Sequence, residues 1–182
     1  MDEARAISLA GVPAEDDARL ARAATEDRAA FAVIYERHRT PVYRYLRART
    51  TTDADAQDLA AITFERAMGA IHRFQPAGGG MAAWLIRIAR NAHLDALRRR
   101  GARGADVPSD GAEAAIDPSD DAVVLRSLID GLPAAQRDAI QLRFAAGLTA
   151  REIGGVLGIS EAAAQKQVER GLQSLKEAYG DD

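Results

Sequence analysis

The chain has 182 residues, 47% of them apolar and 28% charged, which suits one ordinary globular domain or two small ones. It has no cysteine and only three histidines, which excludes disulfides, thiolate zinc sites and cysteine nucleophiles, and we expect no cofactor or metal. The net charge of −3 divides unevenly: −4 over residues 1–27, +8 over 28–104, −6 over 105–131 and −1 over 132–182.

Residues 1–19 form an acidic extension, which we expect to be a solvated tail; shielding of the basic block that follows is the alternative. A secretory signal would be basic and then apolar, and no apolar run approaches the length of a membrane span. These features predict a cytoplasmic protein.

Residues 20–102 predict a basic helical domain. Asp27 is placed to cap its first helix, in which Pro41 favours a break. A second helix starts near Asp53, and Pro76 with the glycines of 78–80 ends it in a loop. The histidines are scattered along these helices, where exposed or half-buried positions are expected for them: His38, His72 and His93.

The third helix, MAAWLIRIARNAHLDALRRR, has one polar face. At 100° per residue its polar residues project within about 80° of one another: Arg87, Asn91, Asp95 and Arg98. Beside a glycine-rich loop and two aromatic rings, such a face can hold phosphates and offer stacking surface to an unstacked base. The alternative is that Arg87 and Asp95 are salt-bridged surface residues, and for Trp84 we favour a place in the core.

Residues 103–122 have the Gly, Pro, Ser, Asp and Ala content of a flexible acidic linker, and residues 123–182 predict a second helical domain. No segment shows strand alternation, so we expect an all-α protein of two small helical domains.

The segment LTAREIGGVLGISEAAAQKQVERGLQSL predicts a helix-turn-helix. Thr149 and Glu152 form a capping box, Gly158 suits the left-handed turn, Ile159 is an apolar plug and Ser160 caps the next helix. The buried stripe of that helix is expected to be Ala164, Val168, Leu172 and Leu175, and the opposite side is polar. DNA binding is favoured over a plain helical hairpin.

Three motif blocks together resemble a known family. DADAQDLAAITFERA, then FQPAGGGMAAWLIRIARNAHLDALRRR, then, after the linker, LPAAQRDAIQLRFAAGLTAREIGGVLGIS resemble a group IV, or extracytoplasmic-function, sigma factor of bacterial RNA polymerase. The resemblance covers about residues 20–178. It implies a promoter-specificity subunit whose partners are core RNA polymerase, through its clamp and flap, promoter DNA, and an anti-sigma factor.

The resemblance also implies roles for individual residues. Promoter melting and the downstream element are assigned to Phe74, Gln75, Met81, Trp84, Arg87, Arg90, Asn91, Arg98 and Arg99. Polymerase binding is assigned to Asp55, Asp58, Leu59 and Phe64. Recognition of the upstream element is assigned to Ser160, Ala162, Ala163, Lys166, Gln167 and Arg170.

The chain departs from the family pattern in two places. The Gln and Glu that usually follow the Asp-Leu pair are Ala61 and Ile62 here, so the contacts with the clamp are expected to differ. The usual Thr-Val-Lys-Ser-Arg run of the recognition helix is the segment 163–167, Ala-Ala-Gln-Lys-Gln. Since fewer basic side chains face the phosphates, we expect weak upstream binding without the polymerase.

Two other classes remain open, a stand-alone helix-turn-helix regulator and a helical adaptor that binds a regulator without DNA. An enzyme is not expected, because the sequence has no catalytic triad or paired carboxylates and its glycine run lacks the Lys and Ser or Thr of a P-loop.

Overall fold

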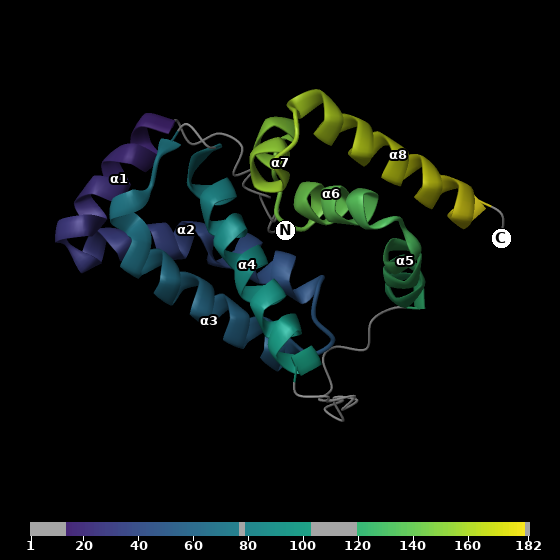
Figure 1. Ribbon diagram of the computed structural model, residues 1–182, viewed down its shortest axis with the longest axis horizontal. Helices are drawn as coiled ribbons and strands as arrows, with labels where there is room; N and C mark the ends of the chain where they lie inside the picture. Colours follow the sequence, from purple (N-terminus) through teal and green to yellow (C-terminus); the bar gives the residue numbers. More distant parts are fainter. Residues whose placement is uncertain (1–13, 77–78, 103–119, 181–182) are drawn as a thin grey trace, which may run out of the picture.

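The computed structural model describes residues 14–76, 79–102 and 120–180, and its regular elements in these ranges are all helical. The first group of helices is α1 (Ala14–Glu26), α2 (Arg28–Arg47), α3 (Asp53–Ala70), a 3-10 turn η2 (Ile71–Arg73) and α4 (Gly80–Ala102). The second group is α5 (Asp120–Gly131), α6 (Ala134–Phe144), α7 (Ala150–Leu157) and α8 (Glu161–Gly180) (Figure 1). The all-α expectation is confirmed.

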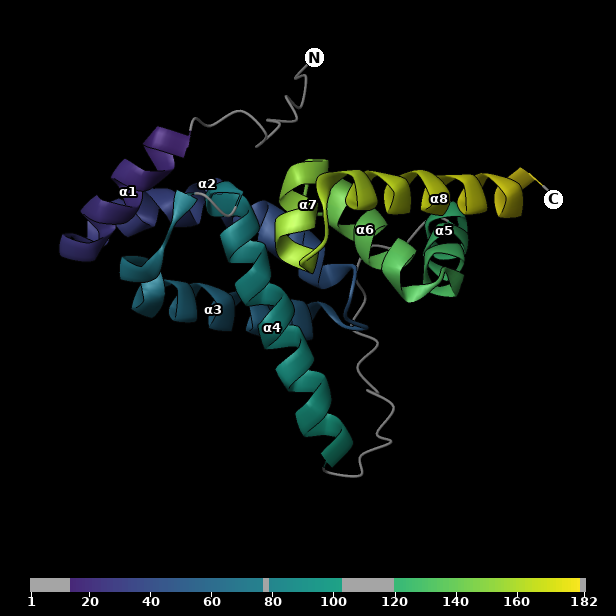
Figure 2. The same cartoon turned by 45° about the horizontal axis from the view of Figure 1, so that its top comes forward.

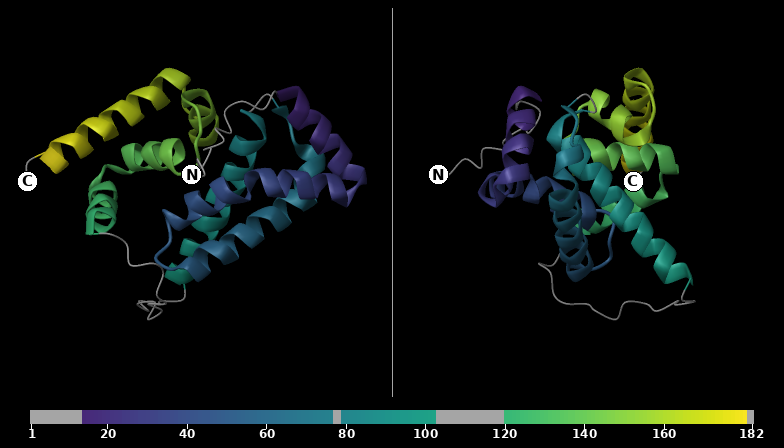
Figure 3. Two further views of the ribbon diagram at one scale, coloured as in Figure 1. Left: turned by 180° about the vertical axis from the view of Figure 1, so that it is seen from behind. Right: turned by 60° about the vertical axis from the view of Figure 1, so that its left-hand side comes forward.

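The helices of each group pack against one another. In the first group α2 and α3 lie side by side, α4 packs on both, and α1 packs on α2 and on the start of α4 (Figure 3). In the second group α8 packs on α6 and on α7, which runs crosswise to it, with α5 beneath (Figure 2). None of the helices in the described residues is long and apolar enough to cross a membrane.

Helix α2 shows how burial overrides a local signal. Asp27 caps it as expected, its side chain accepting a hydrogen bond from the Ala29 amide. The break expected at Pro41 is absent, because α2 continues through that residue to Arg47. Buried side chains on both sides of the proline, including Ile34 and Leu46, hold the two halves against the same neighbours, and this packing offsets the lost backbone hydrogen bond.

The two groups of helices share one continuous set of buried apolar side chains. It runs from Phe31 of α2 through Ala89 of α4 to Leu142 of α6 and Ile153 of α7. Helix α7 packs against α4, as Figure 1 shows. The expected linker, 103–122, lies outside the described residues up to residue 119, and α5 starts at Asp120. The acidic extension, 1–19, lies outside them up to residue 13, and α1 starts at Ala14.

The histidines differ from the expectation. His38 and His93 are buried, at 4% and 8% relative exposure, while His72 is exposed. Burial, together with the charge of Arg37, lowers the pKa of His38 to about 4. Burial and then the charges of Arg49 and Arg100 lower the pKa of His93. His38 is four residues from Ile34 and four from Val42, so it shares their buried face of α2. Its polar ring did not suggest this position.

The buried His38 makes stability depend on pH. Its pKa is 6.5 in the unfolded chain and about 4 in the native protein, so the unfolded state binds more protons between these values. The contribution of the neutral His38 to the free energy of unfolding should be fully present above pH 6.5. Up to about 3 kcal/mol of it should be lost as the pH drops towards 4. Measured by urea unfolding, the free energy of unfolding should differ less between pH 4.5 and pH 7 in His38→Gln than in wild type. His72→Gln is the exposed control, and an unchanged difference in His38→Gln would contradict the assignment.

Candidate nucleic-acid interface

The helix-turn-helix forms as its sequence predicts. Thr149 Oγ1 accepts from the Glu152 amide at 3.3 Å, and Glu152 Oε2 accepts from the Thr149 amide at 2.8 Å. Gly158 ends α7 with φ 72°, in the left-handed region that glycine adopts without a steric cost. Ser160 Oγ then accepts from the Ala163 amide at 3.2 Å and starts α8. The capping box, the turn glycine and the second cap are all confirmed.

The buried face of α8 is rotated from the expected one. Ala164 is fully buried and Val168 and Leu175 are partly buried, but Leu172 is 44% exposed. Gly171 takes its place: a Cβ there would lie 2.7 Å from Ile140 Cγ1, so the Ile140 side chain of α6 packs directly on the backbone of α8 at the glycine. The stripe therefore passes through Gly171, because the geometry of the α6 contact decides which side of the helix is covered.

The expected apolar plug at Ile159 is also wrong, since its side chain is 39% exposed. Backbone contacts hold the turn instead. The Ile159 amide donates to the Gly154 carbonyl at 3.0 Å, and a Cβ on Gly154 would lie 2.7 Å from the Ile159 carbonyl oxygen. The turn can close this tightly only because residue 154 has no side chain.

Gly154→Ala should consequently destabilise the helix-turn-helix. The added methyl group meets backbone, which cannot rotate away, so we expect a loss of about 1 to 3 kcal/mol in the free energy of unfolding. Gly131→Ala, at a position with nothing within 4 Å of its Cβ, is the matched control and should be neutral or slightly stabilising. Denaturant unfolding measures both. A Gly154→Ala protein as stable as the control would rule out the close approach.

The outer side of α8 exposes most of the predicted recognition residues. Ser160, Ala162, Lys166 and Arg170 are exposed, and Ala163 and Gln167 are half-buried. Lys166 and Arg170 are four residues apart, so they lie on the same side of the helix. The small side chains near the start of α8 leave room for a DNA groove to approach, and the two cations can contact phosphates or base edges.

The polar face of α4 is divided between solvent and the second group of helices. Asn91, Arg98 and Arg99 are exposed, and Arg98 pairs with Asp95 at 3.2 Å. Arg87 Nη2 donates to the Gly155 carbonyl of α7 at 3.1 Å. Arg90 Nη2 lies 3.5 Å from Asp138 Oδ2 of α6. Two of the arginines predicted to contact single-stranded DNA thus bind the helix-turn-helix domain in this arrangement.

The loop from Phe74 to Met81 carries three of the residues assigned to promoter melting, and it is described except for residues 77 and 78. Phe74 and Trp84 are half-buried and meet edge to face, with ring centroids 5.5 Å apart. Gln75 is exposed, whereas Met81 is 1% exposed and packs in the core. The aromatic pair therefore lies at the edge of the core, and Met81 lies within it.

The residues predicted to bind the polymerase lie on α3. Asp58 is exposed, and Asp55 is partly buried and paired with Arg100 of α4. Leu59 and Phe64 are both 6% exposed, and the Phe64 ring meets Tyr35 edge to face at 4.8 Å. Of the four, only Asp58 is exposed to solvent, and Leu59 and Phe64 are buried in the core.

A cluster that the sequence did not predict joins the two groups of helices. Asp138 of α6 pairs with Arg49 at 2.5 Å and with Arg90, and Arg49 also lies over the Tyr45 ring, 4.8 Å from its centroid. Burial raises the pKa of Tyr45 to about 12. Nearby, Gln141 Nε2 donates to the Ala48 carbonyl at 3.2 Å. No short-range pattern marks this cluster, because Arg49 and Asp138 are 89 residues apart.

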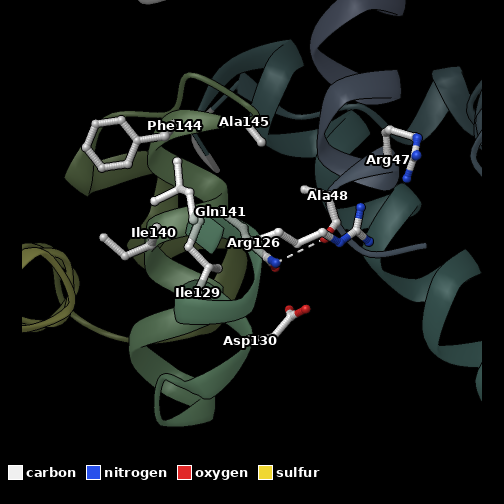
Figure 4. A pocket seen from close by; sticks show the side chains of 10 residues that line it. Arg47, Ala48, Arg126, Ile129, Asp130, Ile140, Gln141, Phe144 and Ala145 are labelled. Atoms are coloured by element: carbon white, nitrogen blue, oxygen red, sulfur yellow. Dashed lines mark hydrogen bonds between the residues drawn. The ribbon is translucent and has the colours of Figure 1, made fainter. Parts of the chain in front are cut away.

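A cavity of about 300 Å³ opens beside this cluster, between the end of α2 and helices α5 and α6. Figure 4 shows Phe144, Ile140 and Ile129 on one side of it and Arg47 and Ala48 on the other. Arg126 crosses the gap and donates to the Thr50 carbonyl at 2.5 Å. The described residues include no group of three or more His, Cys, Asp or Glu side chains arranged to hold a metal ion.

Comparison with known proteins matches two family descriptions. Sigma-70 region 2 matches residues 34–103, and Sigma-70, region 4 matches residues 122–175. The chain is 32% identical over 154 residues to the ECF RNA polymerase sigma factor SigE of Mycolicibacterium smegmatis, and the match covers 79% of this chain and 59% of SigE. It is 33% identical over 159 residues to the RNA polymerase sigma factor CarQ of Myxococcus xanthus, covering 84% and 90% of the two chains.

Solved structures show the same architecture. CnrH, in complex with the cytosolic domain of CnrY, superposes with a TM-score of 0.71 at 27% identity, over 91% of this chain and 98% of that one. The sigma factor RpoE of Bartonella quintana, in complex with the anti-sigma factor NepR, gives a TM-score of 0.63 at 25% identity, over 79% and 93% of the chains.

Proposed function

The chain belongs to the sigma-70 family, as an extracytoplasmic-function sigma factor, and from this premise we propose that it is a promoter-specificity subunit of bacterial RNA polymerase. In this role it binds core polymerase, recognises an upstream and a downstream promoter element, and helps to melt the DNA at the start site. The observation that carries the proposal is the pairing of two modules in one chain, a basic helical domain and a helix-turn-helix domain, in the order of sigma regions 2 and 4.

Each module has a proposed task. The outer side of α8 enters the major groove of the upstream element, with Lys166 and Arg170 as its cations. The α4 face and the loop from Phe74 to Met81 hold the unpaired strand of the downstream element, where stacking on an aromatic ring and contacts with phosphates stabilise open DNA. Asp58 and its neighbours on α3 bind the clamp of the polymerase, and the second domain contacts its flap.

The same proposal covers the chemistry, place and partners of the protein. The polymerase forms the phosphodiester bonds, so this subunit is non-catalytic and needs no cofactor of its own. It acts in the cytoplasm, where the polymerase is. An anti-sigma factor is a further partner, supported by the Bartonella quintana relative that forms a complex with one.

The two domains pack against each other in this structure, an arrangement that we call closed. Arg87 and Arg90 cannot contact DNA while they bind Gly155 and Asp138 of the helix-turn-helix domain. The domains therefore have to separate when the protein joins the polymerase and the promoter.

Two alternative functions predict different behaviour. A stand-alone helix-turn-helix regulator would bind a symmetric site without polymerase, and a helical adaptor would bind a regulator without supporting transcription. The family match over the first domain, which a stand-alone regulator does not need, favours the sigma subunit over that regulator.

Transcription from fragmented genomic DNA by purified core RNA polymerase, with and without this protein, tests the proposal. New transcript 5′ ends that share a pair of short upstream elements would support it. No new starts, with the protein still co-eluting with polymerase, would favour the adaptor. No co-elution, together with binding of a symmetric DNA site, would favour the stand-alone regulator.

A further inference from the structure

One side chain of α1 is tied to the beginning of α4. Asp17 is 5% exposed, and its Oδ2 accepts a hydrogen bond from the Met81 backbone amide at 2.7 Å. The two residues are 64 positions apart in the sequence. The N-terminal end of α1 and the start of α4 lie close together in Figure 1. Asp17 also lies outside residues 34–103, the part of the domain that matches sigma region 2.

The hydrogen bond from the Met81 amide to Asp17 supplies a partner for one of the first amides of α4. The first amides of a helix have no partner within it, and Met81 is the second residue of α4. A carboxylate at this end satisfies one amide and interacts favourably with the helix dipole. Burial raises the pKa of Asp17, whereas the Met81 amide and the charge of Arg37 lower it. The hydrogen bond and the nearby charge offset part of the cost of keeping the carboxylate away from water.

The backbone before Met81 leaves little room for displacement. Gly79 and Gly80 have φ of 103° and 78°, a conformation that other residues rarely adopt. A Cβ on Gly80 would lie 3.3 Å from Asp17 Oδ2, and one on Gly79 would lie 3.3 Å from Glu152 Cα of α7. The glycines thus lead the chain into α4 between α1 on one side and α7 on the other. When the domains separate, the α7 contact is lost and the α1 contact remains.

We infer that Asp17 is a positioning residue for promoter opening: its carboxylate fixes the start of α4 and so orients the surface of α4 that receives the unpaired strand. This inference rests on the proposed function. Asp17 does not touch DNA. It acts through the Met81 amide, which sets where α4 begins and therefore where Trp84 and the polar face of α4 point.

The first test needs no DNA. Amide hydrogen exchange in the full-length protein should show Met81 at least about tenfold less protected in Asp17→Ser and Asp17→Ala, because both lose the acceptor. Asp17→Asn keeps an oxygen at the same reach and should retain most of the protection. Asp16→Asn, one residue earlier on α1 and half-exposed, is the matched control. Unchanged protection of Met81 in Asp17→Ser would overturn the inference.

The second test measures opening itself. With holoenzyme on a promoter found by the genomic experiment, fluorescence of 2-aminopurine in the melted strand should rise about tenfold more slowly for Asp17→Ser, and Asp17→Asn should restore most of the rate. Affinity for core polymerase should stay unchanged. Normal opening by Asp17→Ser, with wild type active, would overturn the positioning role alone. Wild-type holoenzyme that starts no transcripts would overturn the proposed function, and the positioning role with it.

Discussion

Asp138→Ala is expected to shift the protein from the closed towards an open arrangement of its two domains. The Asp138 carboxylate lies between Arg49 and Arg90, and the three side chains are 22%, 11% and 30% exposed. Without the carboxylate, two partly buried cations face each other with no counterion. Because breaking a buried pair costs about 3 to 5 kcal/mol and these groups retain some solvent, we expect about 1 to 3 kcal/mol against the closed state.

The absence of cysteine makes this measurable with two introduced dyes. Cysteines replacing Ala32 of α2 and Lys176 of α8, both exposed positions, report the separation of the domains by energy transfer. Transfer should fall in Asp138→Ala, and affinity for single-stranded DNA should rise as Arg87 and Arg90 are freed. Asp130→Ala, which removes an exposed carboxylate from α5, should change neither. Equal transfer efficiency in Asp138→Ala and wild type would show that the cluster does not hold the domains together.

Loss of both cations on the outer side of α8 should nearly abolish promoter selection. Each contact with a phosphate or a base is worth about 1 to 3 kcal/mol, and contacts at separate positions are roughly additive. Lys166→Ala combined with Arg170→Ala should therefore lower transcription from the promoters found for wild type by at least about tenfold. Promoter affinity of the double variant should also depend less steeply on salt concentration, because it releases fewer counterions on binding.

The control for this double variant is Lys176→Ala, which removes an exposed cation from the far end of the same helix. It should transcribe as wild type does, and both proteins should bind core polymerase equally well. Full transcription by the double variant, with the start sites unchanged, would mean that α8 does not read the upstream element.

Much of the second domain could be predicted because its signals are local. The capping box joins Thr149 and Glu152, three residues apart, and Gly158 and Ser160 complete the turn within the same short segment. Such contacts depend only on residues close together in the sequence, so the residues that make them can be predicted from the sequence. The same holds for Asp27 at the start of α2.

The errors arose where a distant segment decides which side of a helix is covered. Leu172 has the right spacing for a buried residue, yet the close approach of Ile140 places Gly171 at the contact. Pro41 favours a break, but packing on both sides keeps α2 intact. The sequence likewise held no sign that Arg87 and Arg90 of α4 would bind the other domain.

The sequence by itself determined the cap of α2, the helix-turn-helix with its caps, and the family, since these depend on patterns within one element or on the order of motifs. Only the tertiary structure decided that Asp138 bridges Arg49 and Arg90 and that Asp17 holds the start of α4, contacts that span 89, 48 and 64 residues. The physical reason is that such pairs have no fixed spacing. They form when the burial of apolar faces brings distant helices together, and their polar partners are chosen by that packing.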